Sequence, residues 1–285
     1  MKSRLRNLAA RKLGAAHRIL ERFVYAPWFD APICSAPMAS RETYLELART
    51  AAQVDYEEVS AFEAQTGFAI DREWLDDLAL QTQVILKKSP ICYAHGRVLY
   101  SALSRYLKDT PIRSPCDRIT ILETGTSRGF SALCMAKALH NHGRPGTILT
   151  FDVLPHVASM YWNCVGDWDH GPQSRADLLR PWRDLLTDYV IFHQGDTRLE
   201  LPKTQVDRVH FAFLDGAHTF EDVMFEFEQV RDRQQAGDMI VYDDYTPRQF
   251  PGLVKAVDKI CSDYGYSRTM LKAHAGRGYV IASRI

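Results

Sequence analysis

The sequence lacks several features that would assign it at once to a class of protein. Its 285 residues contain no apolar run close to the roughly 20 residues that cross a bilayer, and its six cysteines form no C-x-x-C pair. These absences exclude a membrane-spanning helix, a zinc site built on cysteine pairs and a disulfide framework, so we expect reduced thiols and a cytoplasmic protein. Neither sign of charge is in excess, because 35 basic residues balance 35 acidic ones, and we therefore expect no nucleic-acid partner.

The composition is that of a globular protein, with 46% hydrophobic and 25% charged residues, and leaves room for one α/β domain and an appendage. Apolar periodicity in the first part of the chain predicts helices near residues 41–53, 72–87 and 93–108. Pro111 and Pro115 then break the chain. We therefore predict an α-helical N-terminal cap over residues 1–110 and an α/β domain over residues 111–285.

Residues 2–24 form a basic amphipathic pattern, in which seven basic residues accompany a single acid, Glu21. Two interpretations stay open. The helix rests on anionic lipid at a membrane surface, or its apolar stripe packs against protein, either its own domain or a partner subunit of a homo-oligomer. The second is the more common use of such a stripe, and we favour it.

From residue 119 onward, strands and helices alternate, which is typical of a mostly parallel sheet with helices on both faces. Strands are expected at 119–122, 147–152, 189–193, 209–215 and 239–243, and helices at 219–235 and 250–264. The end of the chain differs, because two strands, 267–273 and 278–283, are joined by a connection of hairpin length. The pattern predicts a Rossmann-like, doubly wound α/β sheet of seven strands with an antiparallel C-terminal hairpin.

The first of these strands runs into a glycine turn. The β-branched run 119–122 is followed by Glu123, and then by Gly125 and Gly129 on either side of Ser127. A strand, a glycine turn and a helix place backbone N–H groups at a helix N-terminus, at the carboxyl edge of the sheet, which is a nucleotide-binding corner. The spacing is E-x-G-x-x-x-G and not the dinucleotide pattern G-x-G-x-x-G, and the carboxylate suits a ligand with an amino group better than a pyrophosphate.

Three aspartates follow two neighbouring strands. Asp215 ends the strand 209–215, and Asp243 and Asp244 end the strand 239–243. Adjacent strands lie about 4.8 Å apart, so these carboxylates are expected to converge and to raise each other's pKa values. A hard divalent cation with oxygen ligands, such as Mg²⁺, would resolve that repulsion. The other interpretation is that Asp215 caps the next helix and that the other two acids lie in a solvated turn.

These features together resemble a known family. The turn from Glu123 to Gly129 resembles the first motif of the class I S-adenosylmethionine (SAM)-dependent methyltransferases, and the terminal hairpin resembles the last two strands of their sheet. The aspartates resemble the magnesium ligands of the metal-dependent O-methyltransferases of the catechol, macrolide-sugar and cephalosporin-tailoring types. His218 stands three residues after Asp215, where the catechol type has a lysine base and several sugar-methylating relatives have a histidine.

The resemblance implies a role for each candidate residue. The methionine end of SAM would lie on the turn, which supplies Glu123, Gly125, Thr126, Ser127 and Gly129. Asp152, at the end of the second strand, would bind the ribose, and Asp196 the adenine side. Asp215 would contact both the cofactor and Mg²⁺, which Asp243 and Asp244 would also hold. His218 would be the catalytic base, because a neutral imidazole accepts a proton readily near pH 7.

The predicted function is SAM-dependent and Mg²⁺-dependent O-methylation of a small hydroxylated acceptor, such as a sugar, a catechol or a polyketide-like diol. One alternative is an NAD-linked oxidoreductase, which the missing G-x-G-x-x-G and the hairpin disfavour. The other is an inactive methyltransferase-like binding or assembly module. Two features stay ambiguous. His95 of the cap could reach the site or be structural, and the tryptophans at 162, 168 and 182 could stack on a substrate ring or pack helices onto the sheet.

Overall fold

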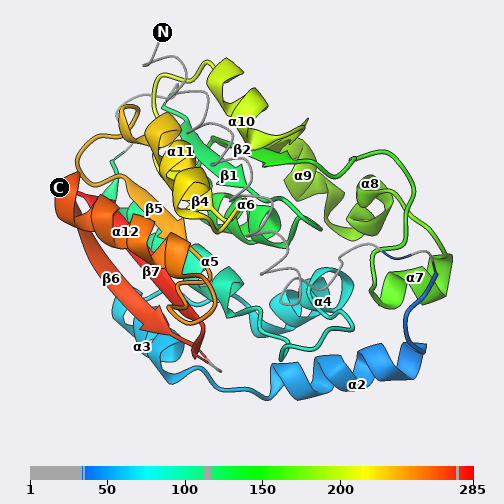
Figure 1. Cartoon of the computed structure of the whole chain (residues 1–285). Helices are drawn as coiled ribbons and strands as arrows, with labels where there is room; N and C mark the ends of the chain where they lie inside the picture. Colours follow the sequence, from blue (N-terminus) through cyan, green and yellow to red (C-terminus); the bar gives the residue numbers. More distant parts are fainter. Residues whose placement is uncertain (1–33, 35, 112–116, 274–275) are drawn as a thin grey trace, which may run out of the picture.

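The computed structural model describes residues 34, 36–111, 117–273 and 276–285 (Figure 1). The helix predicted over residues 2–24 lies outside the described residues, so its contact with lipid or with a partner subunit stays a prediction. Among the helices that the structure describes, none is long and apolar enough to cross a membrane. The five described cysteines, at 34, 92, 134, 164 and 261, are free thiols.

The described residues of the α/β part form one sheet of seven strands in the order β3-β2-β1-β4-β5-β7-β6. The strands are β1 (Ile119–Thr124), β2 (Gly146–Asp152), β3 (Val190–Gln194), β4 (Phe211–Leu214), β5 (Met239–Tyr242), β6 (Tyr266–Lys272) and β7 (Gly278–Arg284). The first five are mutually parallel, and β7 pairs antiparallel with both β5 and β6. The predicted doubly wound sheet with a C-terminal hairpin is confirmed.

The strand order reverses at β1, which has β2 on one side and β4 on the other. Thr124, the last residue of β1, pairs with Phe151 of β2 and with Leu214 of β4. In an open α/β sheet, ligands bind outside the carboxyl ends of the strands at such a switch point. The turn after β1 and the acids after β4 and β5 are therefore presented at one edge of the sheet.

Each face of the sheet carries its own set of helices. One core contains Ile121 of β1, Phe213 of β4 and Val241 of β5, and the cap helices pack against it together with α6 (Phe130–Asn141) and α9 (Arg183–Tyr189). The other core contains the neighbouring strand residues Leu122, Leu214 and Tyr242 under α11 (Phe220–Arg231) and α12 (Pro251–Asp263). Successive side chains of a strand point to opposite faces, and this alternation decides which side of the sheet each functional residue meets.

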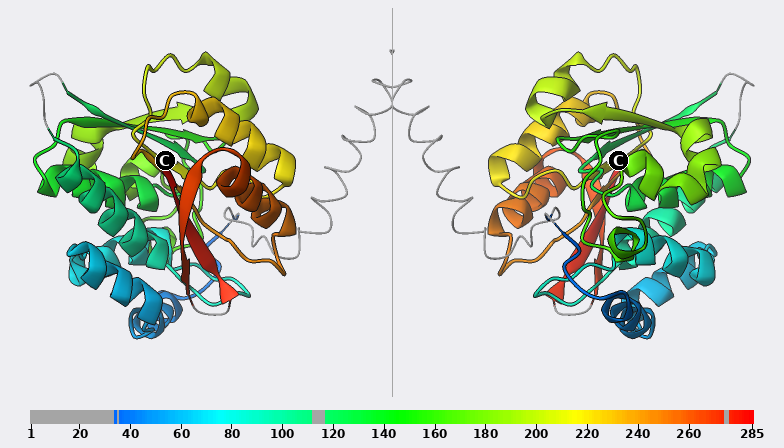
Figure 2. Two further views of the ribbon diagram at one scale, coloured as in Figure 1. Left: turned by 90° about the vertical axis from the view of Figure 1, so that its left-hand side faces the viewer. Right: turned by 90° about the vertical axis from the view of Figure 1, so that its right-hand side faces the viewer.

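The cap contains α2 (Arg41–Ala52), α3 (Glu57–Thr66), α4 (Arg72–Thr82) and α5 (Ala94–Asp109). Figures 1 and 2 show α2, α3 and α4 together at the bottom of the molecule, with α10 (Thr197–Glu200) and α11 at the top. Val98 and Leu103 of α5 are buried in the same core as Ile121 of β1. The division at residue 110 stays a prediction, because this shared core continues across it.

Three differences from the sequence prediction have local causes. Helix α3 was not predicted, because Val59 and Thr66 are its buried residues and its apolar stripe is correspondingly weak. Helix α4 ends at Thr82 rather than at residue 87, since Leu86 leaves the helix to exchange two backbone hydrogen bonds with the Asn163 amide, at 3.1 and 2.9 Å. The segment between β2 and β3, for which no elements were predicted, contains α7 (Val165–His170), α8 (Arg175–Leu178) and the 3-10 turn Arg180–Trp182 ahead of α9. A second 3-10 turn, Leu201–Lys203, follows α10.

Candidate active site

The turn after β1 adopts the backbone that its glycines predict. Gly125, Ser127 and Gly129 have φ values of 83°, 48° and 87°, in the left-handed region that glycine tolerates best. The N–H groups of Gly125 and Thr126 donate to the carbonyl of Phe151 at 2.9 and 3.3 Å. A Cβ atom on Gly125 would lie 2.3 Å from the carbonyl oxygen of Asp215, so only glycine lets the turn touch the end of β4.

Glu123 lies under this turn and is fully buried. Its carboxylate accepts hydrogen bonds from the hydroxyl groups of Ser131 on α6 and Thr150 on β2. Burial raises the pKa of Glu123 to about 7, although both hydrogen bonds act in the opposite direction. Both oxygens of Glu123 are therefore engaged within the protein, and its contact with the amino group of a cofactor stays a prediction.

Asp152 ends β2 and reaches back to the turn. It accepts hydrogen bonds from the backbone N–H groups of Ser127 and, at 2.7 Å, of Leu154. Arg175 lies 3.8 Å from the same carboxylate and donates to the carbonyl oxygen of Ser127 at 2.8 Å. Asp196, after β3, is exposed and caps α10 by accepting from the N–H of Arg198 at 2.8 Å. The predicted cofactor residues thus lie at the ends of consecutive strands.

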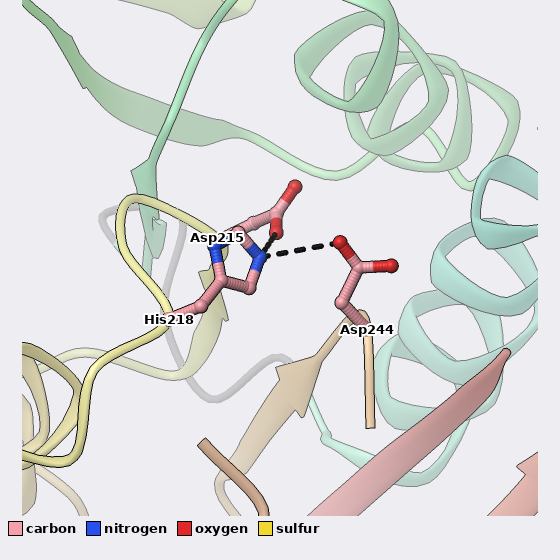
Figure 3. A group of neighbouring side chains, drawn as sticks. All are labelled: Asp215, His218 and Asp244. Carbon is pink, nitrogen blue, oxygen red and sulfur yellow. Dashed lines mark ion pairs between the residues drawn. The ribbon is translucent and has the colours of Figure 1, made fainter. Parts of the chain in front are cut away.

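Asp215, His218 and Asp244 form the acidic part of the site (Figure 3). The Nε2 atom of His218 lies 3.4 Å from Asp215 Oδ1 and 3.2 Å from Asp244 Oδ2. One potential ligand atom from each residue lies within 4.8 Å of the other two. Figure 3 shows the imidazole nitrogen directed between the two carboxylates, with Asp215 and His218 on the segment after β4 and Asp244 after β5. The structure therefore brings together two of the three predicted metal-binding aspartates and the predicted base.

Asp243 points elsewhere, and its carboxylate is almost completely buried. Arg277 donates to both of its oxygens, through Nε at 2.9 Å and through Nη2, and the backbone N–H of Asp244 donates to Oδ1 at 2.6 Å. Sequence reasoning placed Arg277 in the hairpin connection and gave it no role. Strand alternation could have predicted the different orientation of Asp243. Val241 faces the cap side of the sheet and Tyr242 faces the other side, so Asp243 faces the cap side again.

The charges of this group compensate one another. Burial would lower the pKa of His218, but Asp215 and Asp244 outweigh it and raise the value to about 10. Burial raises the pKa of Asp215 to about 6 against the opposing effect of His218. The pKa of Asp244 is lowered, because Arg277 and His218 together outweigh its burial. In the absence of another cation, a protonated His218 and Arg277 supply the positive charge that the three aspartates require.

The donor set fits a divalent cation between Asp215 and Asp244. Asp215 Oδ1 is buried and, besides its ion pair with His218 Nε2 at 3.4 Å, accepts no hydrogen bond from the residues that the structure describes. Asp244 Oδ2 faces the same point from the neighbouring strand end. Two carboxylates are oxygen ligands that Mg²⁺ can use, and the imidazole of His218 lies beside them. The role of Asp243 as a third ligand stays a prediction, and its oxygens are engaged by Arg277.

Of the features left ambiguous by the sequence, His95, Trp162 and Trp182 pack within the protein and Trp168 does not. His95 is buried between the rings of Phe130 and Phe213, with Nδ1 3.8 Å from Asp243 Oδ2, and burial lowers its pKa to about 4. Trp162 is fully buried, and its Nε1 donates to the carbonyl of Gln173 at 2.8 Å. Trp182 packs against the core shared by the cap and the sheet, whereas Trp168 is 55% exposed.

Class I methyltransferases have a doubly wound sheet with a glycine turn at its switch point. Their last strand lies antiparallel between the two strands that precede it in the chain, as β7 lies here between β5 and β6. The match to a family model agrees: residues 122–245 match the family described as a methyltransferase domain. That segment runs from β1 through the turn and the acids to the residue after Asp244. That segment is less than half of the chain, which as a whole shares the methyltransferase fold. A search of curated proteins found no match.

Solved structures share the fold at low sequence identity. The O-methyltransferase TomG from Streptomyces achromogenes, solved in complex with SAM, is 15% identical with a TM-score of 0.52, covering 87% of this chain and 99% of TomG. The O-methyltransferase NovP is 18% identical with a TM-score of 0.51, covering 86% of this chain and 99% of NovP. Cofactor-bound Rv0187 from MTB is 15% identical with a TM-score of 0.50, covering 83% and 94%. At these identities the likeness establishes the architecture.

Proposed function

We propose that this protein is a SAM-dependent O-methyltransferase that methylates a hydroxyl group of a small metabolite with the help of a bound divalent cation, Mg²⁺ in the first instance. The observation that carries the proposal is the contact between the two halves of the site. The turn after β1 touches the end of β4 at Gly125, and the carboxylates of Asp215 and Asp244 begin immediately beyond that contact. Fold neighbours described as O-methyltransferases, one of them in complex with SAM, support the reaction class.

The chain's own residues would bind the cofactor at the switch point. The turn offers backbone N–H groups at the N-terminus of α6, and Asp152 offers a carboxylate suited to ribose hydroxyls. Asp152 now accepts from the N–H of Ser127, so cofactor binding would exchange or share that hydrogen bond. Arg175 holds the carbonyl of Ser127 and so keeps the turn in place.

The acceptor side of the site would be built by Asp215, Asp244 and His218. A bound Mg²⁺ would act as a Lewis acid that lowers the pKa of the acceptor hydroxyl. His218 then has a second task. Asp215 and Asp244 raise its pKa, and with both carboxylates engaged by a cation they would favour the protonated imidazole less. A neutral His218 can accept the proton of the acceptor as the methyl group is transferred. Two adjacent acceptor oxygens, as in a catechol or a sugar diol, suit a metal ion that keeps open positions.

Calorimetry with SAM and with NADH tests the cofactor, and we expect SAM alone to bind. With a panel of catechols, glycosides and polyketide-like alcohols as acceptors, Asp215→Asn and Asp244→Asn should each lower cation-dependent turnover by about 100-fold or more, as expected for groups that stabilise charge in the transition state. Binding of SAM should change little in Asp244→Asn.

Asp263→Asn provides the matched control, because this exposed aspartate at the end of α12 pairs with Lys259 and Ser262 of its own helix. It should leave turnover unchanged. Binding of NADH without SAM would overturn the methyltransferase proposal in favour of an oxidoreductase. Full turnover in EDTA would remove the cation from the mechanism and leave the carboxylates with His218 alone.

A further inference from the structure

We infer that Asp243 is a positioning residue and not a cation ligand, and that Arg277 of the terminal hairpin clamps it so that Asp244 is aimed into the site. This inference rests on the proposed function, because it concerns the residues that would hold the cation. It reassigns one of the three aspartates that the sequence pattern groups together, and it gives the hairpin a part in the chemistry of the site.

The first observation is that both oxygens of the Asp243 carboxylate already accept hydrogen bonds. Arg277 engages both oxygens in a two-pronged pair, and the N–H of Asp244 also donates to Oδ1, at 2.6 Å. Bidentate arginine–carboxylate pairs are among the strongest hydrogen-bonded contacts in proteins and fix both partners in orientation. The Asp243 side chain is only 1% exposed, so the pair is also shielded from water.

The second observation concerns the backbone of Asp244. Its φ is +54°, in the left-handed region that is unfavourable for a non-glycine residue. Such a conformation persists where neighbouring contacts impose it. Here the Asp243 carboxylate holds the N–H of Asp244, and the next residue is anchored to the start of β7, because Tyr245 N donates to the Gly278 carbonyl at 2.9 Å. These contacts turn the Asp244 carboxylate toward His218.

The third observation is the fit of Arg277 itself. Its Nε lies 3.2 Å from Asp244 Oδ1, while the other oxygen of Asp244 faces His218 at 3.2 Å. One oxygen of Asp244 is thus held by the clamp and the other is presented to the site. The guanidinium lies 6.0 Å from the centre of the buried Tyr279 ring, and Gly278 approaches Tyr245 so closely that a Cβ would lie 2.8 Å from its carbonyl oxygen.

The charge balance leads to the same assignment. Arg277 neutralises Asp243 within the pair, so a divalent cation would meet two carboxylates, those of Asp215 and Asp244, and not three. His95 closes the far side of Asp243, with its imidazole buried and Nδ1 3.8 Å from Oδ2. To reach a cation, Asp243 would have to break a buried bidentate ion pair with Arg277, and breaking such a pair is strongly unfavourable.

Binding of Mn²⁺ to the full chain, followed by the electron paramagnetic resonance of the free ion, tests this assignment without any turnover. Asp244→Asn removes a ligand and should weaken Mn²⁺ binding by well over 100-fold. Asp243→Asn and Arg277→Lys keep the Asp244 carboxylate and remove only the contacts that orient it. Each should weaken Mn²⁺ binding by about 10-fold, within the range for residues that orient a metal ligand. Arg277→Lys keeps the positive charge and loses the planar fork, so it isolates orientation from charge.

The double variant Asp243→Asn/Arg277→Lys should bind Mn²⁺ no more weakly than the weaker single variant, because both changes break the same pair. SAM binding by calorimetry should stay within about twofold in all variants, as a check on the fold. If Asp243→Asn fails to fold, Arg277→Lys decides alone.

Two results would overturn the inference while leaving the proposed function standing: Asp243→Asn losing Mn²⁺ as completely as Asp244→Asn, or Arg277→Lys binding it as tightly as the wild type or more tightly. A wild-type protein that binds SAM but no Mn²⁺ would instead remove the cation from the proposed function, and the inference with it.

Discussion

Glu123 and Glu226 are carboxyl side chains that the fold withdraws from water on opposite faces of β1. Glu123 lies against α6, while Glu226 of α11 accepts a hydrogen bond from the hydroxyl of Thr124 at 2.8 Å. Burial raises the pKa of each to about 7. Together with Asp215 they form a group of buried carboxyl side chains at the carboxyl edge of the sheet, where the ionised form is unfavourable. A cationic cofactor or a metal ion would stabilise that form.

Glu226 allows this to be measured outside the residues assigned to catalysis. Its folded-state pKa of about 7 exceeds its ordinary value of 4.5, so the folded protein holds the proton more tightly than the unfolded chain. The free energy of unfolding should therefore fall as the pH rises from about 4.5 to 7. Glu226→Gln removes that dependence and keeps an acceptor for Thr124. It should exceed the wild type in stability by on the order of 3 kcal/mol at pH 8 and by little at pH 4.5.

Urea unfolding at the two pH values measures this difference. Glu228→Gln, an exposed change two residues away on the same helix, should have no effect at either pH. Equal destabilisation by Glu226→Gln at both values would show that the carboxyl group is required as an acceptor in its ionised form.

The sequence predicted this neighbourhood unevenly at the residue scale. The proximity of Asp215 and His218 follows from their spacing of three residues, and that of Asp244 from the pairing of β4 with β5. The partner of Asp243 could not be derived in the same way. Arg277 is 34 residues away and reaches the site only because β7 runs antiparallel beside β5, a register that the hairpin pattern does not specify.

Among the elements, the turn between β1 and α6 carries the tightest requirement. Gly125 combines a left-handed backbone with a Cβ position 2.3 Å from the Asp215 carbonyl oxygen. Gly125→Ala should therefore push the turn off the end of β4. We expect it to weaken SAM binding by more than about 10-fold, the consequence of misplacing a group that positions a ligand, and to lower stability by more than the about 1–2 kcal/mol of the backbone term alone.

Gly143→Ala is the matched control, because Gly143 has a φ of +56° and, apart from its chain neighbours, no described atom lies within 4 Å of its Cβ position. This variant should lose only the stability that the left-handed backbone costs an alanine, and its SAM binding should be unchanged. Calorimetry and urea unfolding of the two variants separate the cost of the dihedral from the cost of the contact. SAM binding that survives Gly125→Ala would mean that the turn can move away from β4 without consequence for the cofactor.

The elements themselves were predictable where periodicity is strong. The five parallel strands and the hairpin lie within a few residues of their predicted positions, because β-branched runs bounded by glycine and acids leave little freedom. Helix α3 and the segment from α7 to α9 were missed, since their stability comes from tertiary contacts. Tyr44 of α2, for example, donates to the Asn163 side chain at 3.0 Å across 119 residues.

At the scale of the whole molecule, the cap and the sheet share one core. Gly96 of α5 packs so closely on α6 that a Cβ would meet the Phe130 ring at 2.7 Å, and Tyr106 donates to the buried Asp238 at 2.8 Å. Residues 1–110 were predicted as a separate region because prolines interrupt the pattern there. The sequence could not show that the apolar faces of the cap helices are completed by α6 and β1.

We therefore expect the full chain to unfold in one cooperative transition, and residues 111–285 alone to lack a stable fold because the outer face of α6 would be exposed. Differential scanning calorimetry of the full chain and near-UV circular dichroism of the fragment test this. Leu103→Ala, at a fully buried position of α5, should lower the stability of the sheet and the cap together by about 2–5 kcal/mol. Two separate transitions, or a fragment that melts cooperatively, would instead favour two independent units.

The close approach of Gly125 to the end of β4 has one more consequence. Two regions in van der Waals contact cannot shift independently, so a molecule that settles on the turn also selects among the orientations of Asp215, and an ion held by Asp215 selects among those of the turn. Such an influence is reciprocal by thermodynamic necessity. Binding of SAM would thus change the affinity for the cation, and binding of the cation would change the affinity for SAM, through the contact at the backbone oxygen of Asp215.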